Sequence, residues 1–329
     1  MNKLHIACIG AGYIAGKHLA NLSAMGDVEI AGVADVDSQR AAEQAQRFGG
    51  RAYRDWRRLL DEEKPDAVYL CVPPFVHGEP EEALLAARLP FFVEKPLGLD
   101  AELPERVAQT VEAQGLITSV GYHWRYLDTM DRARTLAVAH RPRLALGYWF
   151  DFVPPPSWWI RREASGGQTV EQTTHIFDLA RYLLGDVKRV FSAACPDGLA
   201  NLPEADIDAV SAATLQFHNG AIAVITSTCL VHYPHRIGLW LYAQDLILEC
   251  REFSLRIETA EGRQFFEPKV DPYRAEDEAF VRAVRTGDTT GIRVPYSEAL
   301  QTHRLILRVL ESAREAQPLE LGPEVSVHS

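Results

Sequence analysis

The sequence predicts an α/β domain with a doubly wound parallel sheet, followed by an α+β domain with a large, mostly antiparallel open sheet. From Lys3 to about Gly121, short apolar runs alternate with helix-like stretches, a rhythm typical of strand–helix–strand units. Beyond Gly121, strand-like runs follow one another with only turns between them, which indicates antiparallel pairing. We therefore expect a first domain over residues 1–121 and a second over residues 122–329.

The predicted strands of the first half are almost entirely apolar, as burial on both faces of a parallel sheet requires. They are Leu4–Ile9, Val28–Ala34, Ala67–Val72, Phe91–Val93 and Ile117–Val120. The helices predicted between and after them are Ala15–Ser23, Gln39–Phe48, Trp56–Glu63, Pro80–Ala87 and Leu103–Gln114.

The second half contains predicted strands joined by tight turns. Asn219-Gly220 favours a type I′ hairpin turn, in which both central residues have positive φ, and Ala260-Glu261-Gly262 indicates a second turn. The strands are Leu144–Asp151, Arg189–Ala194, Val210–Phe217, Ala221–Leu230, Leu239–Tyr242, Leu246–Glu249, Ser254–Thr259 and Gln264–Phe266. The helices are Glu171–Leu184, Ala275–Thr286 and Tyr296–Ala316.

Composition excludes several classes of partner. The 329-residue chain carries a net charge of −11, which disfavours nucleic acid because phosphate binding needs a basic surface. Its five cysteines are scattered without a CxxC pair, so we expect reduced thiols in a cytoplasmic protein. No apolar run reaches the ~18 residues of a membrane span. The histidines show no HxxxH or His/Cys spacing, so no metal is predicted.

The stretch HIACIGAGYIAGKH (residues 5–18) places a glycine-rich turn between the first predicted strand and the first predicted helix. Gly10 permits a tight turn, Gly12 lets the backbone approach a pyrophosphate, and Ala15 is small enough for close helix–strand packing. Tyr13 and Ile14 complete the turn at a helix N-terminus, whose N–H groups favour phosphate. This context predicts dinucleotide binding rather than an incidental loop.

Asp35 follows the second predicted strand, 20 residues past Ala15, where an acid accepts hydrogen bonds from the adenosine ribose. Its charge repels a 2′-phosphate, so NAD is favoured over NADP as the cofactor. Arg40 in the next helix could approach a 2′-phosphate, and NADP therefore stays open.

Glu94-Lys95-Pro96 follows the predicted strand Phe91–Val93. Ligands of doubly wound sheets bind at the carboxyl ends of the strands, so Lys95 is expected to point toward the nicotinamide end of a cofactor. From spacing alone, a surface lysine at a strand end is an equal alternative.

At this point the chain resembles the family of glucose–fructose oxidoreductase, inositol dehydrogenase and MocA-like oxidoreductases (Gfo/Idh/MocA). The segments that carry the resemblance are GAGYIAGKH (10–18), VADVDSQRA (33–41), CVPPFVH (71–77), FVEKPLG (92–98), GYHWRY (121–126) and GGQTVEQTTHIFDLARYLLGD (166–186). The resemblance covers essentially the whole length and implies an N-terminal Rossmann domain. It also implies a homodimer or homotetramer formed through the C-terminal sheet.

The same resemblance implies roles for individual residues. Lys95 would anchor the substrate, and His175 would be the acid/base. Cofactor contacts are implied at the strand ends, at Val72, Pro73, Pro74, His77, Glu94 and Lys95.

Glu171 and His175 are four positions apart, so on a continuous helix they share a face, with Asp178 further along it. A carboxylate beside an imidazole raises its pKa and fixes its tautomer, so we expect Glu171 to orient His175. The family usually reads Asp-x-Gly-x-His, whereas this chain has Glu171 and Thr173. A reshaped pocket is therefore expected, in which Gln172 can hydrogen-bond a polar substrate. A surface ion-pair row is the alternative.

Candidate substrate contacts lie in two loops. His123 and Arg125 belong to GYHWRY, and Trp158, Trp159 and Arg161 lie upstream of the predicted catalytic helix. Indole faces and arginine forks suit a carbohydrate or cyclitol. Packing of the tryptophans in the core or at an interface is the alternative.

Together these residues predict an NAD(P)-dependent dehydrogenase that transfers hydride between the nicotinamide and a hydroxyl-bearing carbon of a sugar, cyclitol or related polyol. His175 would take the hydroxyl proton while Lys95 holds the oxygen. Two other hypotheses stay open: a cofactor-bound sensor or regulator without turnover, and a reductase of a non-sugar ring substrate.

Overall fold

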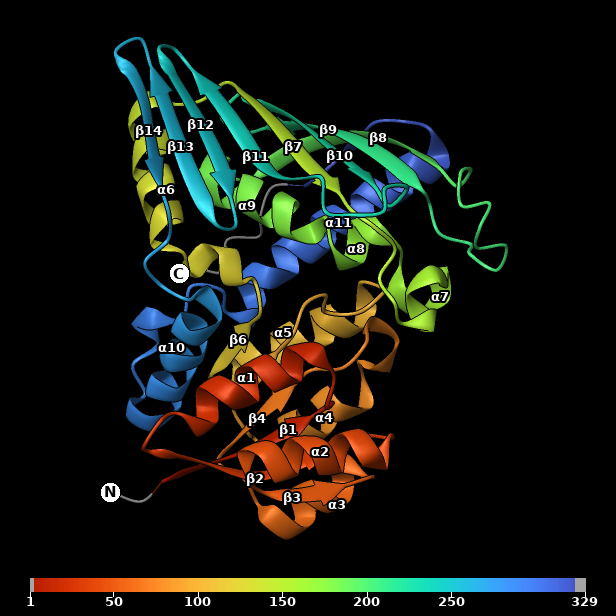
Figure 1. Ribbon diagram of the computed structural model, residues 1–329, viewed down its shortest axis with the longest axis vertical. Helices are drawn as coiled ribbons and strands as arrows, with labels where there is room; N and C mark the ends of the chain where they lie inside the picture. The colour runs from red at the N-terminus through yellow and green to blue at the C-terminus, as the bar shows by residue number, and fades with distance from the viewer. Residues whose placement is uncertain (1–2, 323–329) are drawn as a thin grey trace. The chain divides into compact units, whose positions relative to one another are not determined.

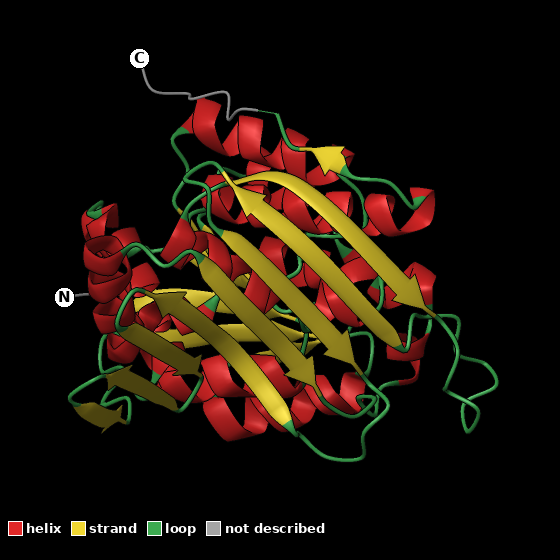
Figure 2. Cartoon of the chain, turned by 90° about the horizontal axis from the view of Figure 1, so that it is seen from above, coloured by secondary structure: helices red, strands yellow, loops and turns green. Residues whose placement is uncertain are grey.

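The chain divides into two units, each built on a sheet of its own (Figures 1 and 2). The computed structural model describes residues 3–322. Unit 1 comprises Met1–Tyr126 and Val270–Leu300, and unit 2 comprises Leu127–Lys269 and Gln301–Ser329. The sequence pattern places one boundary after Gly121 and does not reveal that residues 270–300 return to unit 1. The reason is that a helical pattern does not show which sheet the helix covers.

Unit 1 contains a six-stranded parallel sheet with the order β3-β2-β1-β4-β5-β6. Its strands are β1 (Leu4–Ile9), β2 (Val28–Ala34), β3 (Arg51–Tyr53), β4 (Ala67–Leu70), β5 (Phe91–Val93) and β6 (Thr118–Val120). The predicted doubly wound class is confirmed; β3 was not expected, since its sequence Arg-Ala-Tyr, with the first two residues exposed, is not an apolar run. The strand order reverses between β1 and β4, which is where such sheets bind ligands.

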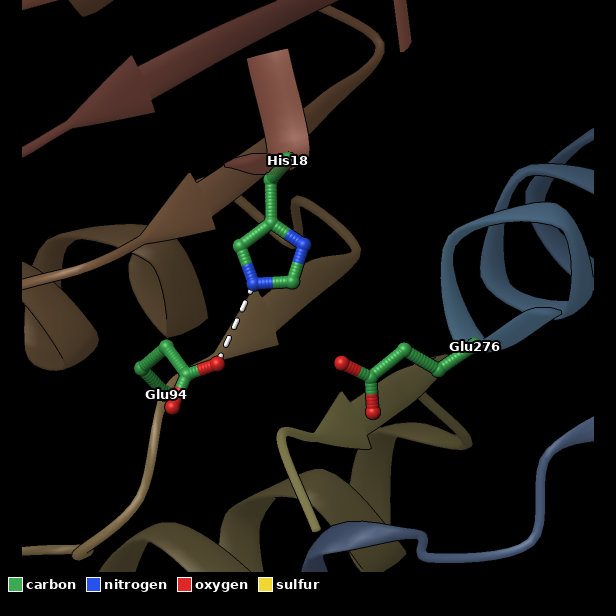
Figure 3. Close-up of side chains that lie close together, drawn as sticks. All are labelled: His18, Glu94 and Glu276. Carbon is green, nitrogen blue, oxygen red and sulfur yellow. Dashed lines mark hydrogen bonds and ion pairs between the residues drawn. The ribbon is translucent and has the colours of Figure 1, made fainter. Parts of the chain in front are cut away.

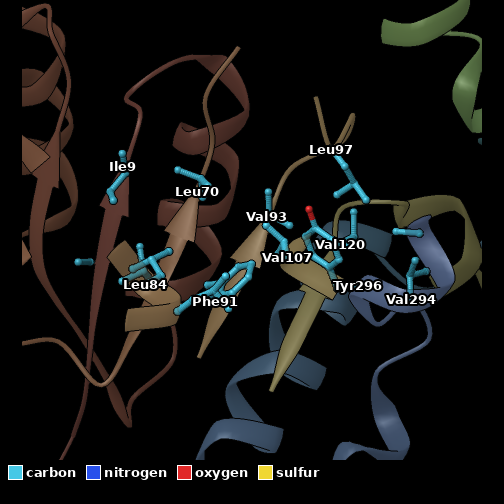
Figure 4. Close-up of a cluster of buried hydrophobic side chains, with 14 of the residues drawn as sticks. Ile9, Leu70, Leu84, Phe91, Val93, Leu97, Val107, Val120, Val294 and Tyr296 are labelled. Atoms are coloured by element: carbon cyan, nitrogen blue, oxygen red, sulfur yellow. The ribbon is translucent and has the colours of Figure 1, made fainter. Parts of the chain in front are cut away.

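Both faces of this sheet are buried, because alternate residues of its strands serve two separate cores. On β1, Ala7 and Ile9 belong to one core, whereas Ile6 and Cys8 belong to the other. Figure 4 shows the first core, with Ile9 among side chains of the neighbouring strands. Phe280 of α10 (Pro272–Thr286) is fully buried in the second core, which explains why this late helix belongs to unit 1.

The helices between the strands of unit 1 begin close to their predicted positions. They are α1 (Tyr13–Ser23), α2 (Ser38–Phe48), α3 (Trp56–Glu63), α4 (Glu79–Ala86) and α5 (Glu102–Gln114). Asp37 caps α2 and Asp55 caps α3, since each carboxylate accepts hydrogen bonds from first-turn N–H groups. In contrast, no side-chain hydrogen bond caps the N-terminus of α1.

Unit 2 contains a nine-stranded sheet with the order β14-β13-β12-β11-β7-β10-β9-β8-β15. Its strands are β7 (Leu144–Phe150), β8 (Val187–Cys195), β9 (Val210–Phe217), β10 (Ile222–Thr228), β11 (Arg236–Ala243), β12 (Leu246–Arg251), β13 (Ser254–Thr259), β14 (Gly262–Phe266) and β15 (Leu319–Glu320). Every pairing is antiparallel except that of β7 with β10. The predicted mostly antiparallel sheet is therefore confirmed.

Helices cover one face of the unit 2 sheet. α6 (Asp128–His140) packs on β12 and β13, and α9 (Thr174–Leu184) packs on β7, β10 and β11. Within the described part of unit 2, no helix lies over the other face, which Figure 2 shows from above. Burial alternates along β9 and β10 accordingly, because successive side chains point to opposite faces.

The hairpin predicted at Asn219-Gly220 joins β9 to β10, but its turn type differs from the prediction. Gly220 has a φ of +85°, whereas Asn219 is not among the residues with positive φ, so the turn is not type I′. The loop instead closes through a hydrogen bond from Phe217 N–H to Ala221 O at 3.0 Å. This longer loop needs positive φ only at the glycine.

The longest helix, α11 (Tyr296–Glu315), begins in unit 1 and continues into unit 2. Charged residues recur along all of its 20 residues. Across residues 3–322, none of the helices combines the length and the apolar character needed to cross a membrane.

Candidate active site

The glycine-rich turn joins β1 to α1, as predicted. Gly10 has a φ of +95°, and a Cβ at this position would lie 2.0 Å from the carbonyl oxygen of Cys71. Its N–H donates to Ala34 O at 2.8 Å. Only glycine therefore fits between the ends of β2 and β4, which is the tight-turn role expected of Gly10.

Gly12 is the N-cap residue of α1 and serves a different purpose. Its φ of −73° is open to any residue, and a Cβ added there would meet no atom within 4 Å. The turn then continues through exposed Tyr13 and half-buried Ile14 to Ala15, which is fully buried as predicted. The open space at Gly12, beside a helix N-terminus without a side-chain cap, fits the pyrophosphate of a dinucleotide.

Asp35 follows β2 and ties the turn to the sheet. Its carboxylate accepts one hydrogen bond from Ala11 N–H and one from Asp37 N–H, both at 2.8 Å. Arg40 lies on the exposed side of α2, where its Nε is 3.3 Å from an oxygen of Asp37. The acid is therefore held at the carboxyl edge of the sheet, the expected place for a ribose contact.

The segment after β4 contributes further predicted cofactor residues. Val72 and Pro73 are half-buried, and Pro74 is buried at the start of a short 3₁₀ helix, Pro74–Val76. The His77 side chain is 1% exposed and forms an ion pair with Glu81 through Nδ1. The segment lies at the carboxyl end of a central strand; a cofactor contact by His77 stays a prediction.

Glu94, between β5 and Lys95, turns its carboxylate into unit 1. It accepts a hydrogen bond from the N–H of Lys95 and bonds His18 Nε2, each at 3.1 Å. His18 Nδ1 in turn lies 2.7 Å from Asp277 Oδ1. Gly121 is needed beside this carboxylate, because a Cβ there would come within 2.4 Å of Glu94 Oε1. This network of hydrogen bonds fixes the backbone of the segment that contains half-buried Lys95.

Burial and neighbouring charges shift the pKa values of the residues in this buried cluster. Burial alone lowers the pKa of His18, but the carboxylates of Asp277 and Glu94 outweigh it and raise that pKa well above its usual value. Burial raises the pKa of Glu276 well above its usual range, and it also raises that of Asp277. No sequence motif marks this cluster, since its members lie far apart along the chain.

The 3₁₀ helix His123–Tyr126 holds the two predicted substrate residues of unit 1. The His123 ring stacks on Tyr273 with centroids 4.2 Å apart. Arg125 Nη2 lies 2.9 Å from Glu298 Oε1. Both side chains are about 95% buried, and the two contacts lie within unit 1.

The prediction of one helix over Glu171–Leu184 is wrong for its first turn. α8 (Gln168–Glu171) ends at Glu171 and α9 starts at Thr174, so Glu171 and His175 do not share the face of one helix. The Glu171 carboxylate accepts a hydrogen bond from the indole Nε1 of Trp159 at 3.0 Å. This bond holds Glu171 at the break between the helices.

His175 lies in the first turn of α9 and is 5% exposed. Its ring stacks on half-buried Trp149 of β7, with centroids 5.7 Å apart and planes 21° apart. Asp178, predicted on the same face, accepts a hydrogen bond from Thr302 Oγ1 at 2.8 Å. Trp149 was not predicted as a site residue, because its sequence context is that of an ordinary strand.

The remaining predicted substrate residues of unit 2 lie in the segment before α8 or directly after it. Trp159 is buried with Ile207 and Cys229, and Trp158 packs against the same cluster, as in the core-packing alternative. Arg161 is exposed, with Nη2 3.8 Å from Glu163. Gln172 accepts a hydrogen bond from Gln168 at 3.1 Å.

A parallel sheet of this order, with a glycine turn, an open helix N-terminus and an acid after β2, defines a dinucleotide-binding domain. Comparison with known families agrees. The sequence profile of an oxidoreductase family with an NAD-binding Rossmann fold matches residues 4–122. The profile of the GFO/IDH/MocA C-terminal domain matches residues 140–249. The chain therefore belongs to the Gfo/Idh/MocA family of oxidoreductases.

Two inositol dehydrogenases are among the relatives of this chain. The myo-inositol 2-dehydrogenase of Thermotoga maritima is 27% identical over 316 residues, which cover 88% of this chain and 90% of that protein. The scyllo-inositol 2-dehydrogenase (NAD(+)) of Bacillus subtilis is 26% identical over 306 residues, or 88% of each chain. The solved structure of aldose–aldose oxidoreductase from Caulobacter crescentus, complexed with glycerol, has a TM-score of 0.86 at 19% identity, covering 97% of this chain and 100% of that one. This last likeness shows the shared fold.

Proposed function

We propose that the protein is an NAD(P)-dependent dehydrogenase acting on a hydroxyl-bearing carbon of a sugar, cyclitol or related polyol. Membership of an oxidoreductase family with an NAD-binding fold supports the reaction type. The inositol dehydrogenases among the relatives support the substrate class. The observation that carries the proposal is the glycine turn at Gly10 and Gly12, tied to Asp35 through Ala11 N–H in a sheet of dinucleotide-binding order.

Asp35 supports NAD rather than NADP as the cofactor. Each of its oxygens accepts one backbone N–H, which leaves lone pairs for ribose hydroxyls. Its charge would repel a 2′-phosphate. Arg40, which could offset this repulsion, is paired with Asp37. The other residues proposed to hold the dinucleotide are Gly10, Gly12, Tyr13, Ile14, Ala15, Val72, Pro73 and Pro74.

In the proposed reaction, His175 accepts the proton of the substrate hydroxyl, and Lys95 stabilises the negative charge that develops on the same oxygen. A bound nicotinamide supplies the hydride acceptor or donor. Trp149 restricts the His175 ring by stacking on it. Trp159 holds Glu171 beside the start of α9 through its N–H.

The test is a panel of sugars and polyols, including myo-inositol, offered with NAD and with NADP while reduced nicotinamide is followed by its absorbance. We expect turnover with at least one member and a higher kcat/KM with NAD. Thermal stabilisation by each cofactor is the control, because a ligand that binds only the native state raises the melting temperature. Stabilisation by NAD without turnover on any member would contradict the proposal and favour a sensor or regulator.

We also propose that the uncovered face of the unit 2 sheet forms a homodimer or homotetramer. Large, exposed apolar side chains lie on its strands, which is typical of an association surface. They are Leu144, Phe191, Val210, Ile222 and Phe265.

A further inference from the structure

Three metal-ligating side chains from distant parts of the sequence converge inside unit 1. His18 lies on α1, Glu94 follows β5, and Glu276 lies on α10. One ligand atom from each lies within 4.8 Å of the others. All three residues are buried, with 0%, 5% and 0% exposure respectively. Figure 3 shows the carboxylates of Glu94 and Glu276 and the imidazole of His18 directed toward one space.

Glu276 is the residue that points to a ligand. Neither of its carboxylate oxygens has a hydrogen-bond partner among the described residues. Its side chain nevertheless extends from α10 toward the His18–Glu94 pair (Figure 3). A fully buried carboxylate without a partner is costly, and buried charges are normally paired or bound to a metal.

Asp277 prepares the imidazole for coordination. It lies 2.7 Å from His18 Nδ1, and its other oxygen accepts a hydrogen bond from the amide of Asn21 at 2.8 Å. A carboxylate on one ring nitrogen fixes the tautomer and turns the second nitrogen toward a metal, an arrangement common around histidine ligands. Here that second nitrogen is Nε2, which faces Glu94.

His18 is the one basic side chain among the described residues that pairs with the carboxyl groups of this cluster. Three carboxyl groups, from Glu94, Glu276 and Asp277, lie around its single imidazole. Among the described residues, no lysine or arginine forms an ion pair with any of them. The neighbouring rings of Tyr69, Phe92 and Phe280 offer no positive charge.

We propose that His18 Nε2, Glu94 and Glu276 bind one divalent transition-metal ion, with Asp277 orienting the imidazole. A mixed nitrogen and oxygen ligand set suits Mn²⁺ or Zn²⁺ better than Mg²⁺ or Ca²⁺. Ligands about 2.1 Å from a tetrahedral ion lie about 3.4 Å apart. The Nε2–Oε1 pair of His18 and Glu94 is already 3.1 Å apart, and all three ligand atoms lie within 4.8 Å of one another, so binding requires them to close in by at most about 1.4 Å.

This site is structural: it would hold the segment before Lys95 in place and takes no part in the proposed proton and hydride transfer. It would link α1, the segment before Lys95 and α10, whose residues are far apart in the sequence: His18 and Glu94 alone are separated by 76 positions. That separation explains why no ligand motif is visible in the sequence, where no metal was expected.

The test measures metal binding to the full chain after treatment with a chelator and dialysis. Calorimetric titration with Mn²⁺ and with Zn²⁺ should show one ion per chain, and both ions should raise the melting temperature. Glu276→Gln should weaken binding at least tenfold and abolish the thermal shift. The matched control is Glu278→Gln, an exposed carboxylate on the same helix that pairs with Arg274; it should behave like the wild type.

Absence of stoichiometric binding to the wild type would overturn the proposal, as would equal binding to wild type and Glu276→Gln. If that variant fails to fold, wild-type protein loaded with Co²⁺ provides an independent readout. Visible d–d bands much more intense than those of aqueous Co²⁺ are expected from a tetrahedral ion with imidazole and carboxylate ligands, and a spectrum no stronger than that of the aqueous ion would overturn the site. None of these readouts uses turnover, so they are independent of the proposed dehydrogenase activity.

Discussion

Alanine at Gly10 should destabilise unit 1, whether or not a cofactor is present. The substituted residue must adopt a φ of +95° and bring its Cβ to 2.0 Å from Cys71 O. The backbone strain costs about 1–2 kcal/mol, and the overpacking adds about 1–3 kcal/mol. At about 2–4 °C per kcal/mol, the melting temperature should fall by roughly 4–20 °C.

Alanine at Gly12 should instead spare the fold and impair cofactor binding. The φ of −73° suits alanine, and its Cβ would meet no atom within 4 Å. Replacing glycine at an N-cap costs about 1 kcal/mol, so the melting temperature should change by no more than a few degrees. The methyl group would occupy space needed by a pyrophosphate, and NAD affinity should fall at least tenfold, or about 1.4 kcal/mol.

The assay is thermal denaturation of wild type, Gly10→Ala and Gly12→Ala over a range of NAD concentrations. Gly26→Ala is the matched control, because its Cβ also meets nothing within 4 Å and it lies outside the turn. It should retain both the wild-type melting temperature and the NAD response. A full NAD response in Gly12→Ala, or wild-type stability in Gly10→Ala, would refute the reasoning.

Three further predictions concern the cofactor, the core of unit 2 and assembly. Asp35→Ser should raise the ratio of kcat/KM with NADP to that with NAD, because the charge that repels a 2′-phosphate is removed; an unchanged ratio would contradict this role. Trp159→Phe removes the N–H that donates to Glu171 at 3.0 Å and should lower the free energy of unfolding by about 1.5–3 kcal/mol, measured by urea denaturation. An unchanged free energy of unfolding would show that this hydrogen bond does not stabilise the fold. Phe191→Lys combined with Ile222→Lys should dissociate the proposed oligomer in light scattering, and an unchanged mass would exclude this sheet face.

Local patterns in the sequence were sufficient for most elements of the fold. The strands Leu4–Ile9 and Val28–Ala34 were predicted with their observed bounds, because burial on both faces makes them apolar except at His5 and Glu29. α6 was missed, since its buried face is made largely of small side chains such as Ala133 and Ala137, which give a weak periodic signal. The interruption of the helix after Glu171 was also missed. It accompanies a hydrogen bond from Trp159 to Glu171, a contact that no local sequence pattern reveals.

Only the residues of the candidate site that belong to a short sequence motif were predicted. The turn at Gly10 and Gly12 and the acid at Asp35 lie within contiguous segments, and their spacing was informative. The stack of Trp149 on His175 joins a strand to a helix, and the bond from His18 to Asp277 joins residues 259 positions apart. Such contacts depend on tertiary packing, which no local pattern records.

The central claim is that Lys95 and His175 act on the same substrate oxygen, and a double-mutant cycle tests it most directly. Turnover on the best polyol would be measured for Lys95→Met, His175→Asn and the double variant, with NAD-dependent thermal stabilisation as the control for cofactor binding. Each single substitution should lower kcat at least 100-fold while the NAD response persists, and the double variant should be scarcely slower than the worse single one, because groups that act as a unit are not additive. Losses that multiply in the double variant, or singles that retain wild-type turnover, would contradict the claim.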